Sequence, residues 1–331
     1  MPFQTIATSP TEILDLLDVP ALLLSNDRVA HANQAALTMF GRHIEGQDVR
    51  IALRHPDAIE LLTSDRNDNV RVSGLSTNGS LWQIDCNTLA DGTRLVTLTD
   101  LSVQESVARA HADFVANASH ELRTPLAAIL GYVETLKDAK AGDNEATRLR
   151  FLDIIAKEAN RMQALVEDLM SLSRIEASKH QLPTESVDLI AIARQTIGET
   201  LSSERIQLEA NISEAEISGD ASQLAQVVRN LIENALKHGG TDLPVTVNVE
   251  KGSTGWISLS VIDKGDGIAP QHMPRLTERF YRADPGRSRQ IGGTGLGLAI
   301  VKHIVERHRG RFDIASRLGQ GTTATCIFPP S

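Results

Sequence analysis

The first group that could do chemistry is a histidine with a carboxylate directly after it and a proline four residues after that carboxylate. His120, Glu121 and Pro125 lie in the string SHELRTPL. An imidazole is a competent nucleophile near neutral pH when a carboxylate orients it and takes up charge. A proline inside a helix removes one backbone hydrogen bond and bends the helix, which exposes the preceding turn. The string predicts a nucleophilic histidine on a helix, and the plainer alternative is a surface His-Glu pair.

A second polar group has helical spacing. The residues Asn230, Glu233, Asn234 and Lys237 stand at i, i+3, i+4 and i+7, so one helix face carries all four. Two amides, a carboxylate and an ammonium are costly to bury, but they suit a hydrated Mg²⁺ and a polyphosphate. An ordinary solvated helix face is the alternative for this pattern taken alone.

A third group follows the apolar run 257–262, which is typical of a strand. Asp263 ends the run, and Gly265 and Gly267 come directly after it. A carboxylate at the end of a strand can accept a hydrogen bond from an exocyclic amine, and glycines let the backbone approach a flat base. The alternative is an Asp-Gly hairpin turn.

A glycine-rich run leads into the last helix-like segment: Gly292, Gly293, Thr294, Gly295, Leu296 and Gly297. Glycines before a helix N-terminus form an anion site. The run is not G-x-G-x-x-G, because Leu298 stands at the last glycine's place, and it lacks the Lys-Ser/Thr of a Walker A loop. The long segment before it is predicted to be functional, for example a lid, and residues 275–289 within it carry five arginines: Arg275, Arg279, Arg282, Arg287 and Arg289.

These strings resemble the sequence boxes of sensor histidine kinases of the HisKA class. SHELRTPLAAILGY is similar to the H-box, and the strings around Asn230, Asp263 and Gly293 are similar to the N, G1 and G2 boxes. Residues 278–282 resemble the F-box, although Thr277 stands where an aromatic residue is common. The boxes occur in the family's order over residues 103–331.

The resemblance implies a role for each residue that matches a box. His120 is the expected phosphoacceptor and Glu121 its general base, while Thr124 would orient a water when the same site dephosphorylates a regulator. Asn230 and Asn234 are expected around Mg²⁺. The remaining expected nucleotide-site residues are Glu233, Lys237, Asp263 on the adenine amino group, Gly265, Gly267, Arg282, Gly293, Thr294, Gly295, Leu296 and Gly297.

Three composition regimes predict the elements that position these residues. Residues 11–100 read as a mixed α/β unit with hairpin signals at Asn78-Gly79 and Asp91-Gly92, and their order of elements resembles a PAS sensor domain. Residues 101–178 are rich in helix formers, and the second of two helices is expected over about 144–173. After a linker at 180–187, residues 188–331 alternate helix and strand. The fold class is therefore multidomain α+β, and the last domain resembles the α/β-sandwich ATP-binding fold shared with gyrase.

The helical region is predicted to be a hairpin that dimerises. Val103, Val107, Ala110 and Phe114 follow the 4-3-4 spacing of a coiled-coil seam, and the second helix carries an apolar stripe from Ile154 to Met170. Two helices alone leave such a stripe unburied. A second copy would cover it, so a homodimeric four-helix bundle is expected.

Charge and apolar runs exclude several classes of protein. The net charge is −9 and the pI about 5.6, which disfavours an electrostatic nucleic-acid binder. Residues 179–331 hold 17 basic and 17 acidic side chains, so this part is the best place for an anionic ligand. Cys86 and Cys326 read as separate buried thiols. No run approaches the 18–20 or so apolar residues of a membrane span, and a cytoplasmic location is expected.

The sequence therefore predicts a homodimeric sensor histidine kinase that uses ATP and Mg²⁺ and passes a phosphoryl group to an aspartate of a response regulator. The run 112–136 is most similar to the phosphate-regulon sensor kinases. One alternative is a protein that acts mainly as a regulator phosphatase or scaffold, which Thr124 permits. Another is an ATP-dependent clamp or chaperone with the same ATPase fold, and a third is a purely structural coiled coil.

Overall fold

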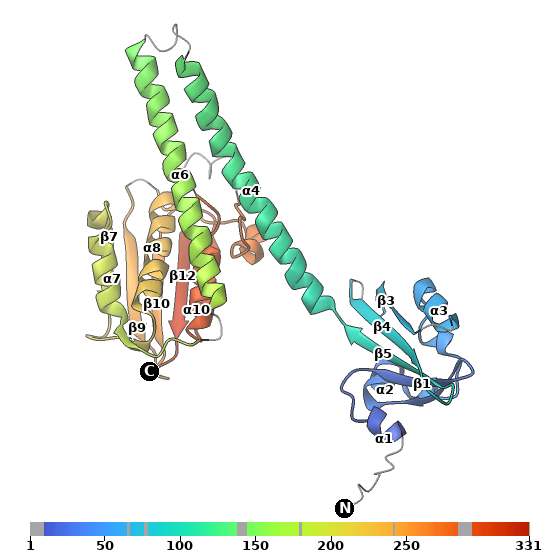
Figure 1. The fold of residues 1–331 in the computed structure, drawn as a ribbon. Coiled ribbons are helices and arrows are strands. Elements are labelled where there is room, and N and C mark those ends of the chain that lie inside the picture. The colour runs from blue at the N-terminus through green and yellow to red at the C-terminus, as the bar shows by residue number, and fades with distance from the viewer. Residues whose placement is uncertain are drawn as a thin grey trace, which may run out of the picture. The chain divides into compact units, whose positions relative to one another are not determined.

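The computed structural model describes residues 10–64, 67–75, 79–137, 144–178, 181–240, 242–283 and 293–330 (Figure 1). The chain divides into two compact units, Met1–Val115 and Ala116–Ser331. The long helix α4, Ser102–Lys137, crosses that division. Parts of three predicted turns or linkers, at Asn78, at residues 142–143 and at His180, lie outside the described residues.

The N-terminal unit is a five-stranded antiparallel sheet in the order β2-β1-β5-β4-β3. A turn at Asn26 and Asp27, with φ of 50° and 63°, joins the first two strands as a type I′ hairpin requires. Three helices accompany the sheet. The bounds are α1 Pro10–Leu14, β1 Ala21–Ser25, β2 Arg28–Ala32, α2 Gln34–Phe40, α3 Pro56–Thr63, β3 Asp68–Ser73, β4 Leu81–Thr88 and β5 Arg94–Asp100.

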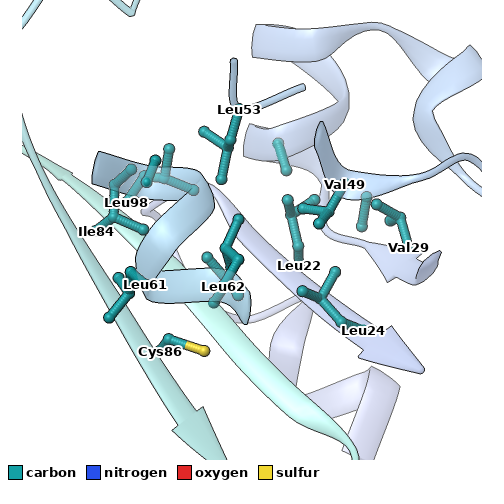
Figure 2. Packing of buried hydrophobic residues seen from close by; sticks show 14 of the residues in the cluster. Leu22, Leu24, Val29, Val49, Leu53, Leu61, Leu62, Ile84, Cys86 and Leu98 are labelled. Carbon is teal, nitrogen blue, oxygen red and sulfur yellow. The ribbon is translucent and has the colours of Figure 1, made fainter. Parts of the chain in front are cut away.

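Aliphatic side chains fill the core of this unit. Figure 2 shows Leu61 and Leu62 of α3 next to Ile84 and Leu98 of the sheet. The buried thiol of Cys86 belongs to the same core and is not in a disulfide. Because such a cluster needs one face of each strand to be apolar, it explains the period-two pattern of β4 and β5.

Asn33 is buried, and its hydrogen bonds link α1, β1 and α2. Its Oδ1 accepts from the backbone N–H of Ala36 at 2.9 Å, which caps α2, and from that of Ala21 at 3.0 Å. Its Nδ2 donates to carbonyl oxygens of the α1 end and the loop after it, including Leu17 at 2.9 Å and Val19 at 2.9 Å. A buried amide with this many partners orients the elements around it.

The second unit begins with two long helices. α4 continues through Pro125, which is buried, and α6 spans Glu145–Ala177 with Asn144 as its N-cap. Large apolar side chains remain exposed along both helices. They include Leu126, Leu130, Leu149, Leu152, Val166 and Met170.

The rest of this unit is a second five-stranded sheet, in the order β11-β12-β10-β9-β7, covered by three helices (Figure 1). Of the strand pairs that the described residues form in this sheet, β7–β9 is parallel and the others are antiparallel. The bounds are α7 Leu189–Gly198, β7 Ile206–Ala210, α8 Ala221–His238, β9 Val245–Lys251, β10 Ile257–Asp263, α10 Gly297–Arg307, β11 Arg311–Arg317 and β12 Gly321–Phe328. A small β6–β8 pair, Ser186–Asp188 with Glu216–Ser218, and a 3₁₀ segment η4, Pro270–Arg275, were not predicted.

Strand and helix periods decide which residues face the interior of this domain. Ile257, Leu259, Val261 and Asp263 are the buried positions of β10, so the carboxylate continues the inward row of apolar side chains. On α8 the apolar face, which runs from Leu224 to Ala235, packs toward the sheet. The packing of α8 on the sheet therefore brings the polar residues of α8 close to Asp263 at the end of β10.

His308 joins the end of α10 to the start of α8. Its side chain is 4% exposed, its Nδ1 lies 2.7 Å from the carbonyl oxygen of Ile304, and the backbone N–H of Asp220 donates to its Nε2 at 3.0 Å. The imidazole accepts at Nε2, so it is neutral. Burial lowers its pKa from the ordinary 6.5, the Ile304 carbonyl acts in the opposite direction, and Arg307 lowers it further.

We expect the domain built on the second five-stranded sheet to lose stability as the pH falls below 6.5. The unfolded chain then binds a proton at His308 more readily than the folded chain, so the free energy of unfolding decreases with decreasing pH. The measurement is hydrogen exchange of α8 and α10 amides between pH 7.5 and 5.5, corrected for intrinsic rates. The His308→Gln variant should be less stable than the wild type at pH 7.5, but its free energy of unfolding should change less with pH. An equal slope of unfolding free energy against pH in both proteins would show that His308 is not the titrating group.

Candidate functional site

A cavity of about 1070 Å³ lies between α6, α8, β10 and the glycine-rich segment before α10. It brings together most of the residues that the sequence analysis singled out. Gly265 and Leu296 are not part of its lining, and Leu296 is buried. The predicted residues that do line it are Asn230, Glu233, Asn234, Lys237, Asp263, Gly267, Arg282, Gly293, Thr294, Gly295 and Gly297.

The polar face of α8 forms one wall of the cavity. Lys237 Nζ lies 2.9 Å from Glu233 Oε2, one turn earlier. Asn230 Nδ2 donates to the carbonyl oxygen of Gly297 at 3.3 Å, and a side chain on Gly297 would touch the amides of Asn230 and Asn234. The α8 face and the start of α10 are therefore close enough to bind one polyphosphate.

Asp263 is a buried carboxylate at the inner end of the cavity. Its Oδ1 accepts from the backbone N–H of Gly265 at 2.9 Å and of Thr322 at 3.2 Å. Burial raises the pKa of Asp263, and these two hydrogen bonds act against that rise. The described residues place no hydrogen bond on Oδ2, which can therefore accept from an amino group in the cavity.

The glycines near Asp263 and at the end of the lid permit close contacts within the chain. A Cβ on Gly265 would lie 2.2 Å from the carbonyl oxygen of His238, and one on Gly267 would lie 2.0 Å from that of Arg317. Gly295 has a φ of +74° and would meet the backbone of Phe280 at 2.9 Å. Glycine is therefore required at these positions because backbone segments pack directly against each other there. Gly267 and Gly295 also line the cavity.

His120 lies exposed on α4, and Glu121 is held by two arginines. Glu121 Oε2 is 2.8 Å from Arg282 Nη2 and 3.3 Å from Arg161 Nη2. Thr124 Oγ1 donates to the carbonyl oxygen of His120 at 3.3 Å, one turn along the same face. The expected partner of Glu121 was the His120 imidazole, whereas in this structure it is a pair of guanidinium groups.

The lid arginines that the structure describes bind carboxylates of the chain. Arg275 pairs with Glu278 at 3.0 Å and lies over the Tyr281 ring, 4.3 Å from its centroid. Arg279 pairs with Glu176 of α6. Among the described lid arginines only Arg282 lines the cavity. Arg287, Arg289 and Gly292 lie outside the described residues.

Sequence reasoning missed the part that α6 plays in this site. Arg161, Leu165, Asp168, Leu172 and Ile175 follow 4-3-4-3 spacing, and the three apolar members are at most 4% exposed. This row faces the domain built on the second sheet, because α6 packs against α10 of that domain. The predicted stripe combined Leu165 with half-buried residues and with exposed ones such as Val166 and Met170. A search for a second heptad row on the helix would have found the face with Arg161 and Asp168.

The donor set fits an ion that arrives with a nucleotide. No group of three or more His, Cys, Asp or Glu side chains in the described ranges could hold a metal alone. The amide oxygens of Asn230 and Asn234, with the Glu233 carboxylate, offer hard oxygen ligands on one helix face. Mg²⁺ commonly combines a few such ligands with water and phosphate oxygens.

Two family models match the chain. The His Kinase A (phospho-acceptor) domain matches residues 110–178, which contain α6 and all of α4 after its first two turns. The Histidine kinase-, DNA gyrase B-, and HSP90-like ATPase matches residues 219–331, which contain the cavity apart from its α6 wall. The described residues contain no helix that is long and apolar enough to cross a bilayer.

Curated relatives match nearly the whole chain. The phosphate regulon sensor protein PhoR of Pseudomonas aeruginosa is 35% identical over 96% of this chain and 73% of its own length. The sensor histidine kinase WalK of Bacillus subtilis is 32% identical over 98% of this chain, which spans only 53% of that protein. The histidine kinase ThkA, solved in complex with response regulator protein TrrA, has the same fold, with a TM-score of 0.55 at 19% identity over 96% of this chain and 98% of that one.

Proposed function

The chain belongs to the sensor histidine kinases, and from that premise we propose that it transfers the γ-phosphoryl group of ATP to His120 and then to an aspartate of a response regulator. One observation carries this proposal. A single cavity joins a buried acceptor, Asp263, to the polar face of α8 and the N-terminus of α10, in a unit whose α4 exposes His120.

The residues of the cavity divide into a base end and a phosphate end. Asp263 Oδ2 accepts from the adenine amino group, and the apolar walls around Val261 and Ile268 contact the ring. Lys237 and the backbone N–H groups at the start of α10 bind phosphate oxygens. Mg²⁺ held by Asn230 and Asn234 would neutralise charge that develops on the phosphates. Most of the rate acceleration then comes from positioning and electrostatics.

In the transfer step a ring nitrogen of His120 attacks the γ-phosphorus, the bond to the bridging oxygen breaks, and ADP leaves. Glu121 orients the imidazole and accepts its proton once Arg282 no longer binds this carboxylate. In the second step an aspartate of the regulator takes the phosphoryl group from His120. The complex of ThkA with a response regulator supports this partner class.

We also propose how the protein assembles and which of its parts senses a signal. The exposed apolar residues of α4 and α6, such as Leu130 and Met170, support a homodimer in which the hairpins form a four-helix bundle. The N-terminal α/β unit, with its sheet order β2-β1-β5-β4-β3, is proposed as a PAS-like sensor. We place the protein in the cytoplasm.

Transfer to a regulator tests the proposed function. The purified protein is incubated with γ-labelled ATP and Mg²⁺, freed of nucleotide, and mixed with each response regulator of the source cell in turn. We expect label on the kinase within minutes and rapid loss of it to one regulator or very few. A kinase that labels but transfers to none would favour a different acceptor, and no label at all would favour the phosphatase or scaffold alternative.

Thr124→Ala should separate kinase from phosphatase activity. The hydroxyl lies one turn from His120, where it can hold a water against a phospho-aspartate, and it has no part in imidazole attack. Autophosphorylation should stay within a few-fold of the wild type, while regulator dephosphorylation falls about 10- to 100-fold. The decay of separately phosphorylated regulator measures this. Equal loss of both activities would mean that Thr124 supports the helix turn.

A further inference from the structure

Asp168 of α6 lies opposite the glycine-rich end of the cavity. Its Oδ2 accepts a hydrogen bond from Thr294 Oγ1 at 2.7 Å, and Thr294 Oγ1 in turn accepts from the backbone N–H of Leu296 at 3.3 Å. A threonine hydroxyl has one proton to donate. The Thr294 hydroxyl, which lines the nucleotide cavity, therefore donates to a carboxylate of the chain itself.

Both burial and neighbouring charges act on the carboxyl group of Asp168. Burial raises the pKa of its carboxyl, Thr294 and Lys237 act to lower it, and the carboxylates of Glu233 and Glu167 act with burial. The proposed function assigns phosphate oxygens to Lys237, and Thr294 lines the same end of the cavity in the glycine-rich run before α10. A polyphosphate here would compete with Asp168 for the Thr294 hydroxyl and for the positive charge of Lys237, and it would bring more negative charge beside Asp168.

The same contact holds the ATPase-like domain on the helical hairpin. The other polar contacts across this junction include Ser171 Oγ to Gln226 Oε1 at 2.8 Å and Arg282 Nη2 to Glu121 Oε2 at 2.8 Å. Among the polar contacts that the described residues make across this junction, Asp168–Thr294 is the one whose donor belongs to the glycine-rich run. The Thr294 hydroxyl therefore belongs both to the phosphate end of the cavity and to the contact with α6.

We propose that Asp168 gates the nucleotide site: its carboxylate takes the position at Thr294 that a phosphate oxygen takes, so nucleotide polyphosphate must displace it and thereby frees the domain from α6. This inference rests on the proposed function, because it requires nucleotide in this cavity. Release would also separate Arg282 from Glu121, which returns the general base to His120. ATP is then both the phosphoryl donor and the ligand that separates the domain from α6.

Calorimetry on the full chain tests the gate with two probes, the non-hydrolysable ATP analogue AMP-PNP with Mg²⁺, and adenosine. Asp168→Ala should bind AMP-PNP about 10-fold more tightly than the wild type, since a charge-assisted hydrogen bond no longer opposes the phosphates. Adenosine affinity should not change, because adenosine lacks the competing group. Asp168→Asn keeps the shape and a weaker hydrogen bond, so its gain should be smaller but in the same direction.

Glu167→Gln is the matched control, because it removes a charge from the same turn while its carboxylate bonds Gln163 on its own helix. Its AMP-PNP affinity should change less than 3-fold by through-space electrostatics alone. Unchanged or weaker AMP-PNP binding in both Asp168 variants would overturn the gate, as would equal tightening of adenosine. A wild-type protein that binds neither probe would instead remove the proposed function, and the gate with it.

Discussion

His120→Gln should reduce phosphate incorporation from ATP to background while nucleotide affinity stays at the wild-type level. The imidazole is the proposed nucleophile, and an amide has no nitrogen lone pair available to attack phosphorus. The side chain is exposed on α4, and the described residues make no side-chain hydrogen bond to it, so the replacement leaves packing unchanged. Label that is lost in acid and retained in base measures the product.

The matched control is His111→Gln. His111 lies on the same helix, is also exposed, and is followed by alanine rather than by a carboxylate. It should label like the wild type. Wild-type labelling of the His120 variant would refute the acceptor assignment, and loss in both variants would point to damage to α4 rather than to lost chemistry.

Asn234→Ala should weaken binding of AMP-PNP with Mg²⁺ by about 30- to 1000-fold, which corresponds to roughly 2–4 kcal/mol. Its carboxamide lines the cavity beside Gly297, and a methyl group can replace neither the ligand oxygen nor the donor. The loss should shrink when Mg²⁺ is omitted, because the oxygen acts through the ion. Calorimetry with and without Mg²⁺ separates these two conditions.

Asn248→Ala controls for the loss of an amide in the same domain. Asn248 lies on β9, outside the cavity lining, and donates to Glu250 at 2.8 Å. Its nucleotide affinity should stay within about 2-fold of the wild type, since surface changes away from a site have small effects. If Asn234→Ala binds as tightly as this control, the metal and phosphates bind elsewhere.

Residues whose position follows from a local period were predictable from sequence. The i, i+3, i+4 and i+7 spacing put the α8 residues on one face, and the cavity contains all four. The alternation in β10 likewise made Asp263 an inward residue. Helix and strand periods act over a few residues, so a single sequence carries them.

Contacts between elements far apart in the chain were not predictable in this way. Nothing local to Glu121 indicates that its partners are Arg161 and Arg282, which are 40 and 161 residues away. The same holds for Asp168 and Thr294, which are 126 residues apart. The glycines near Asp263 were expected to admit a base, whereas the backbone atoms they admit belong to distant segments such as Arg317.

The most direct test of the central claim is to locate the phosphate on the wild-type chain. The protein is incubated with ATP and Mg²⁺, digested with trypsin at neutral pH, and the peptide 110–123 is fragmented in the mass spectrometer. This peptide contains His111, Ser119 and His120, so fragment ions on either side of each residue distinguish them. We expect phosphate on His120, and phosphate on His111, on Ser119 or on another peptide would contradict the assignment of His120 as acceptor.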